Sequence, residues 1–313
     1  MPDSILARRP ATDLSVATTE LILLTGASGN VGTALLRRLV AARKPVRCLV
    51  RDPRRLGQER VRVQIALGDL SNPASFRNAL RGVDTVIHLA AAIRDLDGAS
   101  IEEVNAVATA RLLRGAERGG VKRFLFFSTM GASEHSPSRF FRAKALAEHA
   151  LAESELDTTV FAPSLIYSPG DYWLRIVERM SYLPAVPIVG SGRTLFQPIW
   201  ADDAAACVMA VLEGRRNGEG LVELAGPETL SHDQMVKLIL RSLGRRRRLA
   251  HVPLPLTKLS LRTLEAVVGS SAAFATWEEA ELMEIPMTSS SGTAGAEALG
   301  VTPLRMAAVL GAS

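Results

Sequence analysis

A glycine-rich turn restricts the possible fold more than any other feature of the sequence. It reads Thr25-Gly26-Ala27-Ser28-Gly29-Asn30-Val31-Gly32 and lies between the apolar run 21–24 and an amphipathic segment. Gly26 suits a tight turn, Gly29 lets the backbone approach a pyrophosphate, and Gly32 allows a helix to pack closely on a strand. The amide groups that begin this helix would bind the anion. The turn therefore predicts a dinucleotide site formed by Gly26, Ser28, Gly29, Asn30, Val31 and Gly32.

Short apolar runs alternate with longer periodic segments through the first half of the chain. They predict strands at 21–24, 46–50, 61–66, 85–89, 123–127 and 158–161, and helices near 31–42, 73–81, 101–119 and 140–154. Ser71 followed by Pro73 is typical of the start of the second helix. Continuous apolar strands separated by helices indicate a parallel sheet covered on both faces. We therefore predict an α/β fold, a Rossmann-like doubly wound parallel sheet.

The pattern changes after Pro163, where proline and glycine become frequent and the regular alternation ends. A helix is expected from Asp202 to Gly214, and Ser231 with Gln234 forms a capping-box pattern that begins another. We expect a flexible tail at 1–19 and an NADP(H)-binding core at 20–165. The remainder, 166–313, should be mainly a smaller C-terminal substrate lobe, with elements that return to the core.

Composition excludes several classes of protein. The net charge is +5, but only five of the 37 basic residues are lysine, a bias that fits a GC-rich genome better than polyanion binding, so nucleic acid is not expected as a partner. Two cysteines, Cys48 and Cys207, rule out a disulfide framework and a cysteine-rich zinc site, and the histidines show no metal-ligand spacing. No apolar run approaches the ~18 residues of a membrane span, and no secretion signal is recognisable. We expect a cytoplasmic protein without a metal; its oligomeric state is left open.

The end of the second strand bears on cofactor choice. It reads Leu49-Val50-Arg51-Asp52, with Arg54 and Arg55 close behind. A carboxylate at this position would bind a ribose diol, as in proteins that bind NAD, whereas an arginine would pair with a 2′-phosphate. Arg51 favours NADP(H), and the adjacent Asp52 keeps NAD(H) open.

Several motifs resemble those of atypical or extended short-chain dehydrogenase/reductases. These are the TGASGNVG turn, Gly68-Asp69-Leu70, His88-Leu89-Ala90-Ala91, Phe127-Ser128-Thr129, Pro163 to Asp171, Phe196 to Asp203, and Leu224-Ala225-Gly226-Pro227. The later motifs are similar to the NmrA-like branch and to the nucleotide-binding accessory subunit of respiratory complex I. The resemblance implies that Asp69 and Leu70 contact the adenine. It also implies that Leu89, Ala90 and Ala91 line the adenosine ribose and phosphates, and that Ser164, Leu165 and Ile166 lie near the nicotinamide.

The usual catalytic pair of this family is Tyr-x-x-x-Lys on a helix, aided by a hydroxyl at the end of the fifth strand. The lysine orients the cofactor ribose, and the tyrosine protonates the carbonyl oxygen as hydride arrives. The matching residues here are Phe140 and Lys144, and Phe140 cannot donate a proton. Ser128 and Thr129 match the strand hydroxyl, unless a one-residue shift places Met130 there. The resemblance gives Lys144, Thr129 and Ser128 as catalytic candidates, with Lys144 also binding the cofactor.

The missing acid leaves the source of the proton open. A phenol beside the carbonyl of the substrate could stabilise the alkoxide internally. The alternatives in the chain are Tyr167 and Tyr172, which are more typical of packing, and the loop residues Ser133, His135 and Arg139.

Three functions remain compatible with the sequence. The first is an NADPH-dependent reductase of a bulky, apolar, polycyclic aromatic ketone or quinone, because the second half is rich in Leu, Met and Pro. The arginine-rich composition is similar to that of actinomycete proteins and suggests antibiotic tailoring, with angucyclinone ketones of the simocyclinone type among the possible substrates. The second is a non-catalytic NADPH-binding subunit or redox sensor. The third, a sugar-nucleotide epimerase or dehydratase, needs the tyrosine that Phe140 replaces.

Overall fold

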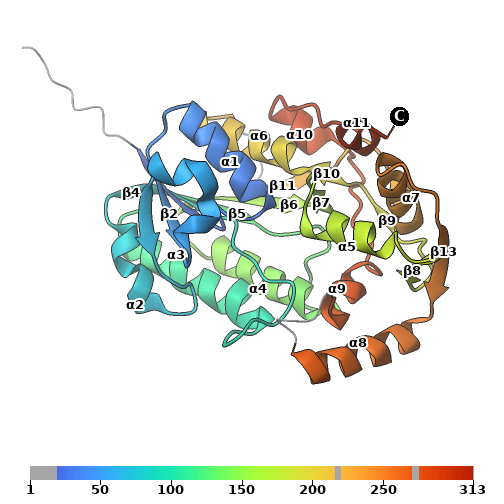
Figure 1. Ribbon diagram of the computed structural model, residues 1–313. Coiled ribbons are helices and arrows are strands. Elements are labelled where there is room, and N and C mark those ends of the chain that lie inside the picture. Colours follow the sequence, from blue (N-terminus) through green and yellow to red (C-terminus); the bar gives the residue numbers. More distant parts are fainter. Residues whose placement is uncertain (1–19, 216–219, 270–274, 313) are drawn as a thin grey trace, which may run out of the picture.

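The computed structural model describes residues 20–215, 220–269 and 275–312 (Figure 1). The expected tail at 1–19 lies outside these residues. Seven parallel strands form one sheet in the order β11-β6-β5-β4-β1-β2-β3. Their bounds are β1 Leu21–Thr25, β2 Val46–Val50, β3 Gln64–Leu67, β4 Val83–His88, β5 Arg123–Phe127, β6 Asp157–Pro163 and β11 Leu221–Leu224.

Helices cover both faces of this sheet. On one face lie α1 (Asn30–Ala41) and α6 (Ala201–Leu212), which pack on each other; on the other lie α2 (Pro73–Phe76), α3 (Ala108–Arg118) and α4 (Arg139–Ala152) (Figure 1). Two 3-10 segments, Pro53–Val61 and Arg77–Leu80, and a π-helical turn, Glu103–Val107, complete the connections. Because each central strand is buried on both sides, its apolar run is continuous. The predicted Rossmann-like fold is confirmed.

Two local expectations were wrong. The third strand begins at Gln64 rather than residue 61, because Pro53–Val61 forms 3-10 turns with Asp52 as the cap and proline in the first turn. Asn72, not Ser71, caps α2: its side chain accepts a hydrogen bond from the amide of Ala74. Ser71 instead donates to the carboxylate of Asp69.

The second half builds a lobe from helices and short two-stranded sheets. The helices are α5 (Tyr172–Met180), α7 (His232–Ser242), α8 (Leu254–Val268) and α9 (Trp277–Leu282). The strand pairs are β7 (Ile166–Tyr167) with β10 (Ile199–Trp200), β9 (Leu195–Phe196) with β12 (Leu230–Ser231), and β8 (Ala185–Val189) with β13 (Arg248–Val252). The capping box of Ser231 and Gln234 at the start of α7 is present as predicted. These elements enclose a third hydrophobic core, separate from the two beside the large sheet.

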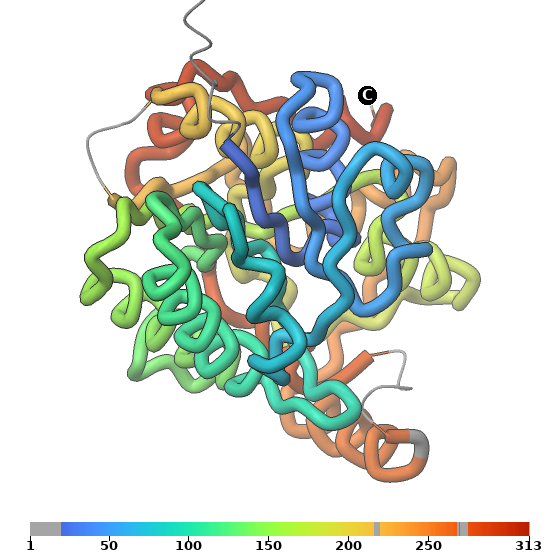
Figure 2. Tube along the Cα trace, turned by 90° about the vertical axis from the view of Figure 1, so that its left-hand side faces the viewer, coloured from blue at the N-terminus to red at the C-terminus, as the bar shows by residue number. Residues whose placement is uncertain are grey.

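Parts of the second half lie within the sheet domain. Besides α6 and β11, the helix α10 (Ala294–Ala298) packs on β11, where a Cβ on Gly295 would lie 2.1 Å from the carbonyl oxygen of Glu223. The helix α11 (Met306–Leu310) follows it, and Figure 2 shows this C-terminal segment in red beside α6 in yellow. The chain thus crosses from the sheet domain to the lobe and returns.

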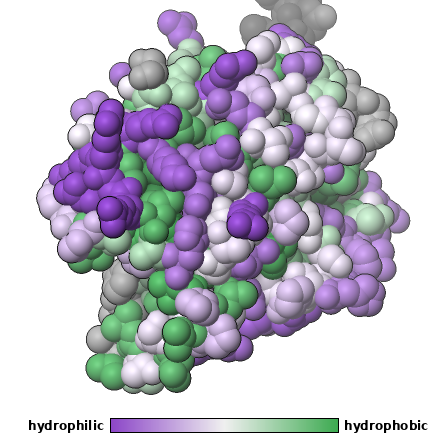
Figure 3. Space-filling view, turned by 90° about the vertical axis from the view of Figure 1, so that its right-hand side faces the viewer, coloured by the Kyte–Doolittle hydropathy of each residue, from purple (hydrophilic) through white to green (hydrophobic). Residues whose placement is uncertain are grey.

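Helix α8 projects at the bottom of the molecule in Figures 1 and 2. It exposes Leu256, Leu259 and Val267, and Figure 3 shows an apolar area at the foot of the molecule, where α8 lies. Among the helices of the described residues, none combines the length and the apolar composition needed to cross a bilayer.

Candidate active site

The glycine-rich turn joins β1 to α1 as the sequence predicts. Gly26 has φ +69°, and a Cβ on it would lie 2.6 Å from the amide nitrogen of Ala90. A Cβ on Gly32 would lie 2.1 Å from the carbonyl oxygen of Gly26, so the helix can approach the turn only without a side chain there. The start of α1 has no side-chain cap and no acidic residue in its first turn. Its amide groups are therefore free to bind a phosphate.

A buried hydrogen-bond chain fixes the loop after β4 against this turn. The hydroxyl of Thr25 lies 2.6 Å from Nδ1 of His88, whose Nε2 lies 2.9 Å from the hydroxyl of Thr109. Thr109 donates to the carbonyl of Asn105, and the Asn105 amide donates to the carbonyl of Ala92 at 2.7 Å. Burial, with a smaller effect of the Lys144 charge, lowers the pKa of His88 to about 3, so this ring is neutral and structural.

At the end of β2, the carboxylate of Asp52 is engaged by a neighbouring arginine, whereas Arg51 is not engaged by any described residue. The carboxylate of Asp52 accepts hydrogen bonds from the Arg54 amide at 3.0 Å and from its guanidinium at 2.9 Å and 3.0 Å. Arg51 is exposed and makes no hydrogen bond or ion pair with the described residues. Across the edge, burial raises the pKa of Asp69, but hydrogen bonds from Ser71 and the Arg51 charge outweigh it and hold that pKa below its usual value. The guanidinium of Arg51 remains available to an anion.

A cleft of about 410 Å³ opens beside the glycine-rich turn. Most of the predicted site residues line it: Gly26, Gly29, Asn30, Val31, Gly32, Leu89, Ala91, Ser128, Thr129, Lys144, Ser164, Leu165 and Ile166. The other predicted residues lie outside its lining: Ser28, Arg51, Asp69, Leu70 and Ala90. Of these, Arg51, Asp69 and Leu70 follow β2 or β3, toward the edge of the sheet where the adenosine half of a dinucleotide would extend.

Lys144 lines the cleft, one helical turn after Phe140 on α4. Its side chain is 2% exposed, and Nζ donates to the carbonyl of Phe127 at 2.6 Å. Nζ also lies 4.6 Å from the ring centre of Phe126 and 5.7 Å from that of Phe140. Burial lowers the pKa of Lys144 to about 7, although the Glu148 carboxylate opposes this shift. The phenyl ring of Phe140 therefore offers the ammonium a cation–π contact and no hydroxyl.

Two hydroxyl groups at the end of β5 face the same cleft. Ser128 donates a hydrogen bond to the carboxylate of Glu148, and Thr129 donates to the carbonyl of Met130 at 3.2 Å. Met130 itself is buried in the core of the lobe and does not line the cleft. The structure thus brings Ser128 and Thr129, rather than Met130, to the site. Glu148, which the sequence did not single out, accepts from Ser128 and interacts electrostatically with Lys144, and burial raises its pKa.

The opposite wall of the cleft is apolar and comes from the second half of the chain. It consists of Trp173, Ile176, Leu282, Met283 and Met287. At its rim the guanidinium of Arg94 donates to Glu279 at 2.5 Å and to the hydroxyl of Tyr172 at 2.5 Å. Nothing in the local sequence marks Arg94 and Glu279, which are 185 residues apart.

The alternative proton donors occupy different places. Tyr172 lines the cleft, whereas Tyr167 is buried in the lobe core, and its hydroxyl has no hydrogen-bond partner among the described residues. Burial, with the Asp203 and Glu228 carboxylates, raises the pKa of Tyr167. Arg139 forms ion pairs with Asp95 and Glu102, and neither it nor Ser133 or His135 lines the cleft.

Comparison with known proteins identifies a nucleotide-binding domain in this chain. Residues 26–179 match the model of a protein family described as NAD(P)H-binding. This part of the chain is an NAD(P)H-binding domain. It carries the glycine-rich turn, Lys144 and the residues that follow β5 and β6. The predicted similarity to atypical short-chain dehydrogenase/reductases is confirmed, and oxidoreductases are among the proteins similar to this chain.

Three curated proteins are similar to this chain in sequence. A mitochondrial protein of Arabidopsis thaliana, NADH dehydrogenase [ubiquinone] 1 alpha subcomplex subunit 9, is 28% identical over 81% of this chain and 65% of its own length. Sterol demethylase protein B of Methylococcus capsulatus is 35% identical over 50% of this chain and 55% of its own. The ceramide reductase of Caulobacter vibrioides is 30% identical over 66% of this chain and 64% of its own. The chain therefore spans less than two thirds of the length of each of these relatives.

A solved structure shows the same fold. The UDP-glucose 4-epimerase of Thermotoga maritima, in complex with UDP-glucose, superposes with a TM-score of 0.70 at 20% identity. The superposition covers 93% of this chain and 96% of the epimerase. At 20% identity this likeness shows a common fold and not a common reaction.

Proposed function

We propose that the chain is an NADPH-dependent reductase of a bulky, apolar ketone or quinone. One observation carries the proposal: a single cleft has the phosphate-binding turn and Lys144 on one side and an apolar wall of Trp173, Ile176 and Met283 on the other. This arrangement suits a cofactor beside a large apolar ligand. Polycyclic aromatic polyketides, which antibiotic tailoring enzymes reduce, are the substrate class that we favour.

The preference for NADPH rests on the end of β2. Arg51 makes no hydrogen bond with the described residues, so its guanidinium can pair with a 2′-phosphate. Both oxygens of the Asp52 carboxylate already accept hydrogen bonds from Arg54, which leaves this group poorly placed to bind a ribose diol. The two observations favour the same cofactor.

The chemistry divides between the cofactor and the chain. When bound, NADPH supplies the hydride. The ammonium of Lys144 would hold the ribose next to the nicotinamide, and the hydroxyl of Thr129 or Ser128 would orient the carbonyl of the substrate. Phe140 supplies no proton, and loss of a general acid costs about 10²- to 10⁴-fold. A substrate with a phenol beside its carbonyl would compensate: the phenol would hydrogen-bond to the developing alkoxide and give it a proton, and water would reprotonate the phenolate.

The names of two relatives support an apolar substrate. Sterols and ceramides are both large apolar molecules, and a sterol demethylase protein and a ceramide reductase are among the proteins similar to this chain. The match to the reductase covers 66% of the chain.

Turnover is tested by mixing the purified protein with NADPH and a panel of polycyclic aromatic ketones and quinones, half of them with a phenol beside the carbonyl. The nicotinamide absorbance should fall with the phenolic ketones, and Lys144→Met should slow this decrease at least about tenfold. Tight NADPH binding without turnover of any compound would refute the reductase proposal.

That negative result would support a second candidate, a non-catalytic NADPH-binding subunit or sensor. Phe140 at the position of the acid and the engagement of Lys144 with the Phe127 carbonyl favour it. One relative is named as a subunit of NADH dehydrogenase, which is consistent with a subunit role. An epimerase or dehydratase, which needs the tyrosine for proton abstraction, is disfavoured by Phe140.

A further inference from the structure

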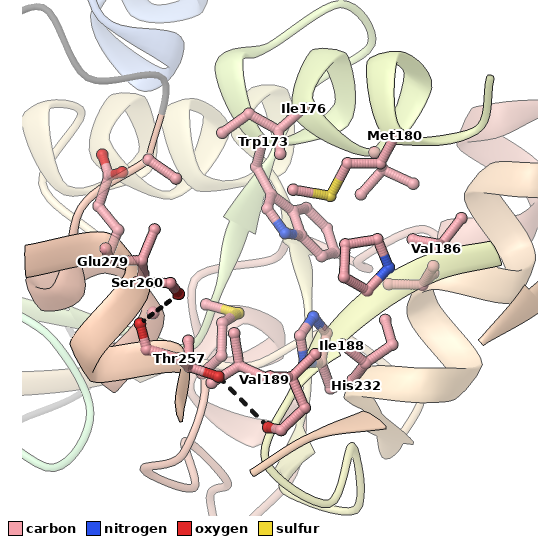
Figure 4. A pocket seen from close by; sticks show the side chains of 18 residues that line it. Trp173, Ile176, Met180, Val186, Ile188, Val189, His232, Thr257, Ser260 and Glu279 are labelled. Atoms are coloured by element: carbon pink, nitrogen blue, oxygen red, sulfur yellow. Dashed lines mark hydrogen bonds between the residues drawn. The ribbon is translucent and has the colours of Figure 1, made fainter. Parts of the chain in front are cut away.

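A second cavity of about 270 Å³ lies beside the cleft, inside the C-terminal lobe; we call it the distal chamber (Figure 4). Residues of α5, β8, α7, β13, α8 and α9 line it. Its apolar lining includes Ile176, Val177, Met180, Val186, Ile188 and Val236. Such a surface suits an apolar group of a ligand.

The distal chamber adjoins the cleft. Trp173, Ile176, Glu279 and Met283 line both cavities, so they form a wall that the two share. A ligand held by the apolar wall of the cleft therefore lies next to the distal chamber. A substrate larger than the cleft can extend into this chamber where the shared side chains make room.

His232 is an unusual residue for such a chamber. His232 lines the cavity and is only 6% exposed, yet neither of its ring nitrogens makes a hydrogen bond with the described residues. Nδ1 in particular is fully enclosed and unpartnered. Burial lowers the pKa of His232 to about 4, so the ring is neutral near pH 7 and presents one donor and one acceptor. A buried polar group without a partner costs stability unless a ligand satisfies it.

Trp173 provides a second polar group without a partner. Its indole N–H donates to no described residue, its ring centre lies 6.5 Å from that of His232, and both side chains point into the chamber (Figure 4). A hydroxyl group between them could accept from the indole and donate to the imidazole.

The other polar residues of the chamber are already engaged. Thr257 donates to backbone carbonyls at its own helix start, and Ser260 donates to the carbonyl of Thr257 at 3.0 Å (Figure 4). Glu279 accepts from Arg94 and from the amide of Thr276. Among the described lining residues, only His232 and Trp173 keep an unused side-chain hydrogen-bond donor for a ligand.

We propose that the distal chamber binds the end of the substrate farthest from the reducible carbonyl, and that His232 and Trp173 recognise a hydroxyl on that apolar end. The chamber thus selects hydroxylated ring systems or chains over purely hydrocarbon ones. The identification of this ligand as the substrate rests on the proposed function, whereas binding to the chamber does not.

The test measures binding without turnover, so it examines the distal chamber independently of the proposed reductase activity. Equilibrium dialysis compares 2-naphthol with 2-methylnaphthalene, which has nearly the same shape and no hydroxyl, against protein with and without NADP⁺. We expect wild-type protein to bind 2-naphthol about tenfold more tightly. His232→Leu should lose this preference and still bind both probes, whereas His232→Gln should keep part of it. His149→Leu, at an exposed histidine on α4, should behave like wild type.

A variant that fills the distal chamber shows whether the two probes bind there. Ala280 lines the distal chamber but not the cleft, so Ala280→Phe should abolish binding of both compounds and leave NADP⁺ binding unchanged. Equal affinity of the two probes for wild-type protein would overturn the proposal. So would a preference for 2-naphthol that survives His232→Leu, or unchanged binding to a folded Ala280→Phe variant. Failure of NADP⁺ to bind would instead contradict the proposed function alone.

Discussion

At the scale of single residues, Arg51 and Arg54 differ in what they already contact, although only three positions separate them. We predict that Arg51→Ala weakens NADPH binding roughly 10- to 100-fold, because a charge-assisted contact to the 2′-phosphate is lost. NADH binding should change little. Arg54→Ala is the matched control, since this guanidinium binds Asp52. Fluorescence titration with both cofactors measures the effects; equal weakening of NADPH and NADH by Arg51→Ala would contradict the phosphate contact.

The buried ammonium of Lys144 should make stability depend on pH. Its pKa is about 7 in the folded protein against 10.5 for an ordinary lysine, so between these values the unfolded chain binds the extra proton. The resulting penalty is absent above pH 10.5, grows as pH falls, and is complete below about pH 7. Wild type should therefore gain on the order of 2 kcal/mol of unfolding free energy relative to Lys144→Met between pH 7 and about pH 9.

Urea denaturation of both proteins at the two pH values measures this difference. Titrating groups that do not interact with Lys144 behave alike in wild type and variant, so their effects cancel in the comparison; Glu148 and His88, which interact with its charge, are the exceptions. Parallel pH dependence in the two proteins would show that Lys144 keeps an ordinary pKa.

At the scale of elements, the packing of α1 on the glycine-rich turn leaves no room for a side chain at Gly32. Gly32→Ala places a methyl group 2.1 Å from a backbone oxygen that cannot rotate away. We expect the variant to lose about 1–3 kcal/mol of unfolding free energy, because α1 must move away from the turn. NADPH binding should weaken for the same reason. Gly220→Ala is the control, since no atom lies within 4 Å of its Cβ position. Thermal unfolding and cofactor titration measure these effects. A Gly32→Ala variant with the same melting temperature and NADPH affinity as Gly220→Ala would contradict the prediction.

At the scale of the whole molecule, the Arg94–Glu279 ion pair ties the loop after β4 to α9 across the rim of the cleft. Both side chains are only 13% exposed, so removing one partner leaves a largely buried charge. We predict that Arg94→Gln increases hydrogen exchange in α9 and weakens substrate binding, while exchange in β1 and β4 stays unchanged. Adding Glu279→Gln should restore much of the protection. Uniformly faster exchange in Arg94→Gln would mean global destabilisation instead.

The sequence predicts contacts between neighbours in the chain better than contacts between distant segments. The turn at Gly26, the spacing of Phe140 and Lys144, and the cap at Ser231 follow from local rules of backbone geometry. The pairing of Arg94 with Glu279, and of Trp173 with His232, depends on how the lobe folds over the sheet domain. No periodicity or motif encodes that docking, so the distal chamber could not be predicted from the sequence.

The hydrogen bonds between Asp52 and Arg54 have a consequence for how cofactor preference could evolve. Loss of Arg51 alone would abolish the phosphate contact without creating a diol site, because Asp52 would still be occupied by its neighbour. A second substitution at Arg54 would be needed to release the carboxylate. A lineage that changes from one nicotinamide cofactor to the other would thus pass through an intermediate that binds both weakly.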